Sequence, residues 1–98
     1  MDKLFVYGIF LDEGNRNAYG MSNPRYATVP NWATVGGYIV EAVPCKGATL
    51  TGLLVDMDET RWERLDQLER GYIRTTVQTT EGINAYMYAG GIPDEEVK

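Results

Sequence analysis

Histidine is absent from the 98-residue sequence, and this absence limits the chemistry that the chain can carry out. Ser-His-Asp and Cys-His nucleophilic schemes and the usual zinc sites all need the imidazole side chain. Proton transfer would therefore fall to Asp, Glu, Tyr, Lys or Cys side chains. The single cysteine, Cys45, has no histidine to act as its base, which favours an inert thiol over a nucleophile.

Glu69 is the carboxylate whose position favours acid/base chemistry. It lies near the end of a predicted helix in which successive side chains are rotated by about 100°. On this helix Trp62, Leu65 and Leu68 form an apolar arc, and Glu69 falls within it. A carboxylate on the apolar side of a helix is unusual, because a buried charge must be paired or neutralised.

Two physical effects would weaken Glu69 as an acid. Burial and the negative end of the helix dipole both disfavour the charged form and raise the pKa of the carboxyl group. A general acid or base that works near neutral pH needs this direction of shift. Helical spacing alone leaves two alternatives open: Glu69 pairs with an arginine such as Arg74, or it swings into solvent at a frayed helix end.

The second candidate feature is the segment Tyr7, Gly8, Ile9 and Phe10, called the 7–10 segment below. It follows an apolar strand that ends at a glycine. Backbone N–H groups in such a strand exit can point at an anion or a carbonyl oxygen. A plain strand-to-loop exit would have the same sequence, so the segment is weak evidence by itself. Four tyrosines could line a pocket: Tyr7, Tyr72, Tyr86 and Tyr88. Tyrosines on amphipathic strands more often pack against their neighbours, so these residues are also weak evidence for a site.

The elements that would position these residues are mostly strands. Runs of β-branched and aromatic residues, often bounded by glycine or turn residues, predict strands. They cover residues 3–8, 32–43 (as one strand or two, with a bend at Gly36-Gly37), 48–56, 72–80 and 83–89. Gly52 inside the third run indicates a close backbone approach.

The predicted connections complete the pattern. Residues 9–30 read as a loop that leaves room for a helical turn or a short strand, and residues 44–47 read as a turn. Asp58 is a predicted N-cap for a helix that reaches residue 69 or 70, with Gly71 just beyond its end. The turn at residues 81–82 makes the last two strands a hairpin. Strands outnumber helices and do not alternate with them, which predicts an α+β fold with a mixed or antiparallel sheet.

Length and composition predict one domain over residues 1–90 with an acidic tail at 91–98. The net charge of −5, with basic residues scattered singly, makes nucleic acid a poor partner. Neither a secretory signal nor a stretch of membrane-spanning length is present. One cysteine excludes an internal disulfide and fits a reducing compartment. We therefore expect a cytoplasmic protein without a membrane partner, whose oligomeric state stays open.

The two candidate features together resemble the γ-glutamylcyclotransferase-like family, which includes the plant avirulence-induced proteins and γ-glutamylamine cyclotransferases. The family opens with a strand that ends in Tyr-Gly-Ser/Thr-Leu, and here the strand reads LFVYGIF. It continues with a helix that ends in Leu-Asp-x-x-Glu-Gly before Tyr-x-Arg, and here LDQLERGYIR occupies that place. The preceding GLLVDMDETRWERLD and the closing AYMYAG match in order, so the resemblance spans nearly the whole chain.

The resemblance implies a small β-barrel-like fold with one main helix and a cavity at one end. It implies release of 5-oxoproline from a γ-glutamyl amine or peptide, without cofactor or metal. Glu69 would be the general acid/base, and the 7–10 segment would cradle the glutamyl group through backbone N–H groups. Tyr72 matches a pocket tyrosine. We therefore expect the Glu69 carboxylate to face a cavity bounded by the 7–10 segment.

The sequence departs from the family pattern at three positions. Ile9 replaces the usual serine or threonine, Phe10 replaces leucine, and Arg70 stands where a glycine commonly follows the glutamate. Retention of Glu69 favours an enzyme, whereas loss of the hydroxyl at Ile9 favours a catalytically silent module that binds a γ-glutamyl-like ligand or a protein. The sequence does not identify the leaving amine or the pathway.

Overall fold

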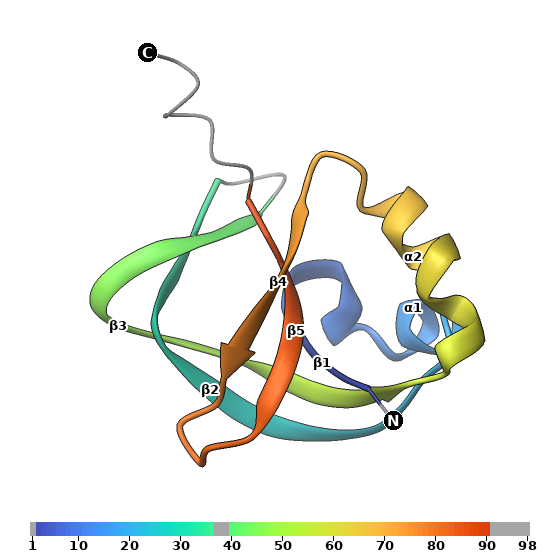
Figure 1. Cartoon of the computed structure of the whole chain (residues 1–98), viewed down its shortest axis with the longest axis horizontal. Coiled ribbons are helices and arrows are strands. Elements are labelled where there is room, and N and C mark those ends of the chain that lie inside the picture. Colours follow the sequence, from blue (N-terminus) through green and yellow to red (C-terminus); the bar gives the residue numbers. More distant parts are fainter. Residues whose placement is uncertain (1, 37–39, 91–98) are drawn as a thin grey trace.

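The computed structural model describes residues 2–36 and 40–90, and within them one five-stranded sheet forms the frame of the molecule (Figure 1). The strand order is β2-β3-β1-β5-β4. The strands are β1 (Lys3–Val6), β2 (Met21–Val35), β3 (Glu41–Met57), β4 (Ile73–Gln78) and β5 (Asn84–Ala89). The helical segments are η1 (Gly8–Leu11), α1 (Glu13–Ala18), η2 (Glu59–Arg61) and α2 (Trp62–Leu68). The α+β class predicted from the sequence is confirmed.

Two predicted connections differ from the structure. Residues 9–30 are not mainly a loop: the helical turn and the strand for which the sequence left room are present, as most of η1, all of α1 and the first ten residues of the long strand β2. Residues 44–47 are not a turn either, because β3 runs straight through them. Pairing with β3 continues on both sides of Asn23 and Asn31, which adopt positive φ at shifts in the register. Non-local hydrogen bonds therefore override the local turn signals.

The turn signals at residues 44–47 mark a bulge instead. The β2–β3 register shifts between Pro30 and Trp32. Asn31 and Gly47 both have positive φ there, +68° and +88°. The Asn31 side chain accepts a hydrogen bond of 3.0 Å from the Gly47 N–H. A bulge of this kind bends the strand pair and increases its twist.

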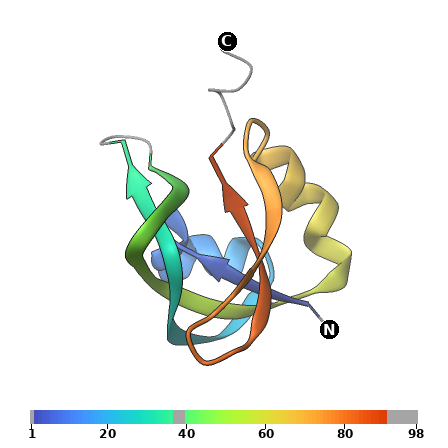
Figure 2. The same cartoon turned by 60° about the vertical axis from the view of Figure 1, so that its left-hand side comes forward.

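The sheet curls until its two edge strands approach each other (Figure 2). β1 pairs antiparallel with β3 and parallel with β5, and β4–β5 is the predicted hairpin. At the open side Thr80, just after β4, donates its N–H to the Thr28 carbonyl oxygen of β2 at 2.8 Å. The result is barrel-like but the sheet does not close into a complete barrel.

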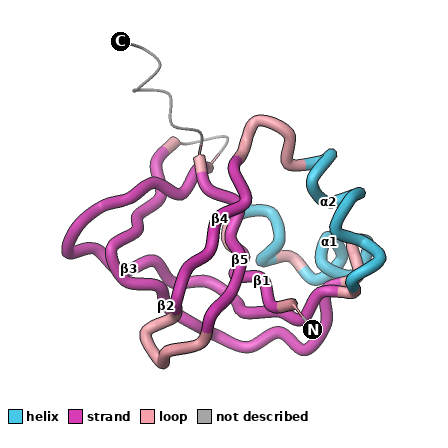
Figure 3. The backbone as a smooth tube through the Cα atoms, viewed as in Figure 1, coloured by secondary structure: helices cyan, strands magenta, loops and turns pink. Residues whose placement is uncertain are grey.

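Each face of the sheet carries its own apolar cluster within the described residues. Phe5, Val29, Leu54 and Met87 are among the residues of the cluster inside the curl. The other cluster lies under the helical segments, which gather at one side of the molecule (Figure 3). Leu4 and Val6 enter that second cluster because side chains alternate along β1. β1 therefore contributes to both cores, as β3 and β5 also do.

The helix that carries the predicted acid/base residue begins and ends close to the predicted positions. Asp58 is an N-cap as predicted, and its carboxylate accepts a hydrogen bond from the Thr60 N–H. η2 then leads into α2, which ends at Leu68 with Glu69 as C-cap. Leu68 departs from the prediction, since its side chain is 45% exposed whereas Trp62 and Leu65 are buried.

No helix within residues 2–36 and 40–90 is long and apolar enough to cross a membrane. The predicted acidic tail, residues 91–98, and Gly37 of the predicted Gly36-Gly37 bend lie outside the described residues. Gly36 has φ +95°. This left-handed conformation is accessible to glycine and occurs directly after β2.

Candidate active site

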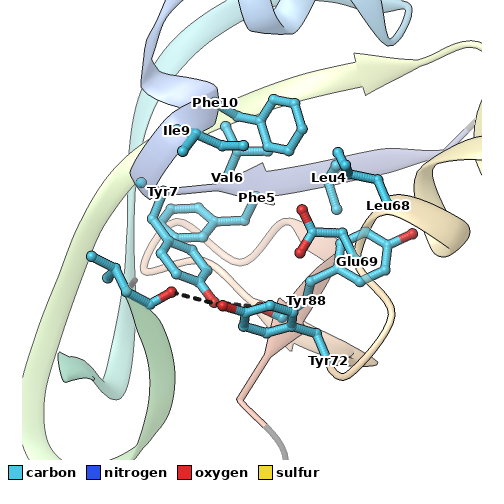
Figure 4. Close-up of a pocket in the computed structure, with 12 residues that line it drawn as sticks. Leu4, Phe5, Val6, Tyr7, Ile9, Phe10, Leu68, Glu69, Tyr72 and Tyr88 are labelled. Carbon is cyan, nitrogen blue, oxygen red and sulfur yellow. Dashed lines mark hydrogen bonds between the residues drawn. The ribbon is translucent and has the colours of Figure 1, made fainter. Parts of the chain in front are cut away.

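A pocket of about 520 Å³ opens where β1 ends (Figure 4). Its walls come from β1, η1, the end of α2, β5 and the residues that precede β3 and β4. All of the site residues predicted from the sequence line it. The lining residues are Leu4, Phe5, Val6, Tyr7, Gly8, Ile9, Phe10, Val40, Leu68, Glu69, Tyr72 and Tyr88.

The 7–10 segment borders the pocket because the chain leaves the sheet at Gly8. Pairing of β1 with β3 stops at Val6 opposite Leu53. Gly8 then adopts φ +72°, which L side chains rarely allow, and η1 begins. The first N–H groups of a helical turn lack acceptors inside it, so those of Gly8 and Ile9 have no acceptor within η1.

Tyr7 joins two strands that the end of β1 leaves apart. Its hydroxyl donates to the carbonyl oxygen of Tyr88 in β5 and accepts from the N–H of Ala42 in β3 at 3.0 Å. Burial is the main cause that raises the pKa of Tyr7 to about 12, and the nearby carboxylates act in the same direction. The hydroxyl of Tyr7 thus holds the pocket together, while its ring faces the cavity.

Glu69 is partly buried at the pocket wall, and it is free of side-chain hydrogen bonds and ion pairs with the described residues. Desolvation by burial raises the pKa of this carboxyl group above its ordinary value. Burial also means that Glu69 does not point into bulk solvent. The arginine that it might have paired with, Arg74, has a different carboxylate partner.

Arg74 pairs with Asp66, at 3.7 Å, rather than with Glu69. The guanidinium group also lies over the rings of Trp62 and Tyr86, 4.6 Å and 5.2 Å from their centroids. Asp66 in turn accepts a hydrogen bond from the Tyr88 hydroxyl. This network joins α2 to β4 and β5, and it leaves the Glu69 carboxylate available to a ligand.

Tyr72 lies across the cavity from Ile9 and Phe10 of the 7–10 segment (Figure 4). Its hydroxyl donates to the Val40 carbonyl oxygen at 3.3 Å. Burial raises the pKa of Tyr72, and the carboxylates of Glu41 and Glu69 raise it further. The hydroxyl is therefore neutral at physiological pH and serves as a hydrogen-bond donor.

The sequence left Tyr88 open between packing and pocket lining and did not place it among the predicted site residues, whereas the structure puts it in the pocket wall. Tyr86 and Tyr88 share one face of β5, but Tyr86 packs edge-on against Trp62 instead of lining the pocket. Strand alternation predicts the shared face. It does not say which tyrosine lies opposite the end of α2, because that depends on how α2 docks.

A metal centre has no ready-made ligand cluster in the described part of the chain. Within residues 2–36 and 40–90 no group of three or more Cys, Asp or Glu side chains is arranged to hold a metal ion. Glu69 is the one carboxylate among the lining residues. What the arrangement offers is a single carboxylate of raised pKa, tyrosine hydroxyls and backbone N–H groups around one cavity.

Structural comparison places this curled sheet with its flanking helix among known folds. An uncharacterized protein from Pyrococcus horikoshii matches with a TM-score of 0.74 at 21% identity, over 93% of this chain and 79% of that one. A protein from Arabidopsis thaliana matches with a TM-score of 0.75 at 21% identity, over 95% and 72% of the two chains. A γ-glutamyl cyclotransferase matches with a TM-score of 0.69 at 18% identity, over 92% and 66%. The chain therefore has the γ-glutamylcyclotransferase-like fold.

The sequence profile of the family described as "Gamma-glutamyl cyclotransferase, AIG2-like" matches residues 4–97. The chain belongs to this family, and the resemblance seen in its motifs is confirmed. A search of curated proteins finds no match to the sequence.

Proposed function

We propose that this protein is a γ-glutamylcyclotransferase-like enzyme that releases 5-oxoproline from a γ-glutamyl amine or peptide. Glu69 is the general acid/base. The observation that carries the proposal is the unpaired Glu69 carboxylate in the wall of a pocket that also includes the 7–10 segment. Membership of the family supports the reaction type.

The reaction needs one proton carrier and no water. Glu69 takes a proton from the substrate's α-ammonium group, and the freed amine attacks the substrate's own γ-carbonyl carbon. A new C–N bond closes the five-membered lactam ring. Glu69 gives this proton to the leaving nitrogen as the amide C–N bond breaks, and it then takes the second proton that the former α-amino nitrogen loses on becoming the lactam N–H. Transfer of the second proton to the expelled amine restores the Glu69 carboxylate. The products are 5-oxoproline, with its carboxylate, and an ammonium ion, so atoms and charge balance.

The environment of Glu69 suits both halves of this cycle. A carboxylate with an ordinary pKa is too weak a base to deprotonate an ammonium group efficiently. Burial raises the pKa of Glu69, which brings it closer to the working pH and favours both acceptance and return of the proton. A cationic α-ammonium group would also be the ion-pair partner that the carboxylate lacks in the free protein.

The proposed roles of the other site residues follow from their positions. The carbonyl oxygen of the glutamyl group becomes an oxyanion during the attack, and N–H groups of Gly8 and Ile9 are suited to receive it. Tyr72 lines the pocket across from Ile9 and Phe10 (Figure 4). Tyr7 supplies its ring and its backbone, because its hydroxyl is already bonded to Ala42 and Tyr88.

A pair of isosteric variants tests the proposal. Glu69→Gln removes the proton-accepting oxygen and should lower the rate of 5-oxoproline release by about a hundredfold to ten-thousandfold, while ligand binding is retained. Glu63→Gln is the matched control, because Glu63 is exposed on the same helix. It should keep the wild-type rate. The assay screens γ-glutamyl dipeptides and γ-glutamyl amines for 5-oxoproline.

Two other results would contradict the proposal. Equal rates for Glu69→Gln and the wild type would show that Glu69 is not the acid/base. Binding of γ-glutamyl compounds without any 5-oxoproline release from the wild type would favour the alternative function, a binding module with the same fold.

A further inference from the structure

The pocket has two unlike sides, and the Glu69 carboxylate lies between them in Figure 4. One side carries the tyrosines Tyr7, Tyr72 and Tyr88. The other side is formed by aliphatic and phenyl groups from β1, η1 and the end of α2, which we call the apolar wall. It consists of Leu4, Val6, Ile9, Phe10 and Leu68.

The apolar wall extends from the buried core to the surface of the protein. Leu4, Val6 and Phe10 are at most 5% exposed, whereas Ile9 and Leu68 are 60% and 45% exposed. The two exposed side chains come from separate elements, η1 and the end of α2. A ligand group that covers both would remove apolar surface from water, which favours an apolar group at this position.

The charges around the pocket also disfavour a carboxylate on the leaving group. Glu69 is the one charged residue among the described lining residues, and none of them is cationic. The guanidinium group of Arg16 beside the apolar wall already donates to the carbonyl oxygens of Phe10 and Leu11. A carboxylate on the leaving group would therefore be desolvated and repelled.

We infer, on the basis of the proposed function, that the group expelled by this enzyme is an amine with an apolar substituent and no carboxylate of its own. The glutamyl part lies on the side of the tyrosines and the N–H groups of Gly8 and Ile9. The substituent of the amine lies against the apolar wall. The reaction remains the one described above, with Glu69 returning the proton to the leaving nitrogen.

Two substrates that differ by a single carboxylate test the inference. γ-Glutamyl-phenethylamide and γ-glutamyl-phenylalanine have the same benzyl group, and only the second carries a carboxylate on the leaving amine. The phenethylamide should have a kcat/KM at least about tenfold higher, the lower end of the discrimination reached in apolar pockets. Equal values, or a preference for γ-glutamyl-phenylalanine, would overturn the inference.

A charge placed on the apolar wall should reverse the preference. Ile9→Lys adds a cation at an exposed position, so it should narrow or invert the ratio of the two kcat/KM values without threatening the fold. Ile73→Lys is the control, since Ile73 is 48% exposed on β4 and does not line the pocket. For Ile73→Lys, the ratio of the two kcat/KM values should equal that of the wild type. The same change of this ratio in both variants would overturn the inference.

Binding measurements separate this inference from the proposed function. Calorimetric titration of the same two compounds should give a Kd at least about tenfold lower for the phenethylamide. That result without any 5-oxoproline would refute the proposed reaction and retain the preference. Turnover of both compounds with equal Kd and kcat/KM would refute the preference and retain the reaction. Failure of both compounds to bind would overturn the two together.

Discussion

Glu69 has no ion-pair partner in the pocket, and this determines how its charge affects the stability of the fold. Burial disfavours the charged carboxylate relative to the unfolded chain, where the same group is fully hydrated. Structural acidic residues such as Asp56 show the opposite pattern: Asn23, Arg25 and Lys3 stabilise its charge and lower its pKa. Unlike Asp56, Glu69 therefore gains no stabilising charge partner from the fold.

The pH dependence of the free energy of unfolding should reveal the cost of burying the Glu69 carboxylate. Between the ordinary pKa of about 4.5 and the raised pKa, the folded state holds a proton that the unfolded state has released. The free energy of unfolding due to Glu69 therefore falls as pH rises through this window. Glu69→Gln does not titrate, so its stability relative to the wild type should increase as the pH rises from below 4.5 through the raised pKa.

Urea unfolding of both proteins across this pH range measures the difference, with Glu63→Gln as the control for any general effect of charge. A wild type that gains stability over Glu69→Gln as pH rises would show that the carboxylate is paired in solution.

Tyr7 is the second residue whose role can be isolated. Tyr7→Phe keeps the ring but removes the hydroxyl that connects Ala42 and Tyr88. Loss of a buried partner typically costs about 1–3 kcal/mol, so the urea midpoint should fall by the corresponding amount. Tyr26→Phe is the control, because Tyr26 is 84% exposed. An unchanged midpoint for Tyr7→Phe would mean that the bridge contributes nothing to stability.

At the scale of elements, the close packing of β1 on β3 sets the position of the 7–10 segment. Gly52 in β3 allows this approach, as the sequence predicted: a Cβ atom there would lie 2.3 Å from the Val6 carbonyl oxygen and 2.8 Å from the Phe5 ring. The first of these neighbours is backbone, so the strand itself must move to accommodate a side chain.

Gly52→Ala should therefore do more than destabilise the fold. Overpacking costs about 1–3 kcal/mol, and displacement of β1 moves the pocket wall that β1 leads into. We expect a lower melting temperature together with a lower rate of 5-oxoproline release at a temperature where the variant is still folded. Thr51→Ala, at an exposed neighbouring position, should change neither. A wild-type rate for folded Gly52→Ala would show that the pocket tolerates movement of β1.

At the scale of the whole molecule, the two apolar clusters share one sheet and should unfold together. Each has its own tryptophan: Trp32 packs against the cluster inside the curl, and Trp62 belongs to the cluster under the helical segments. Small single domains usually unfold in one cooperative transition. The variants Trp32→Phe and Trp62→Phe each keep a single tryptophan, whose fluorescence reports on one of the two clusters.

Unfolding of each variant, followed by fluorescence and by circular dichroism, should give coincident transitions within that variant. Separate midpoints for fluorescence and circular dichroism in either protein would show that one cluster opens before the other.

The sequence alone determined the candidate residues and the local elements. Glu69 was found because a carboxylate on an apolar helix arc is visible from helical spacing. The 7–10 segment was found because a glycine ends a strand there. The β4–β5 hairpin and the N-cap at Asp58 depend on neighbouring residues, so local patterns were sufficient to predict them.

Only the tertiary structure decided which of these residues meet and with which partners. Pairing with β3 makes β2 a strand through residues that read as a loop, and local propensity cannot predict such distant hydrogen bonds. Arg74 had two carboxylates within reach along the sequence, and the docking of α2 on β5 gave it Asp66 and left Glu69 unpaired. The same docking brought Tyr88 into the pocket and left Leu68 at its mouth. These outcomes depend on the relative placement of whole elements, because contacts between distant segments are decided by packing and not by spacing along the chain.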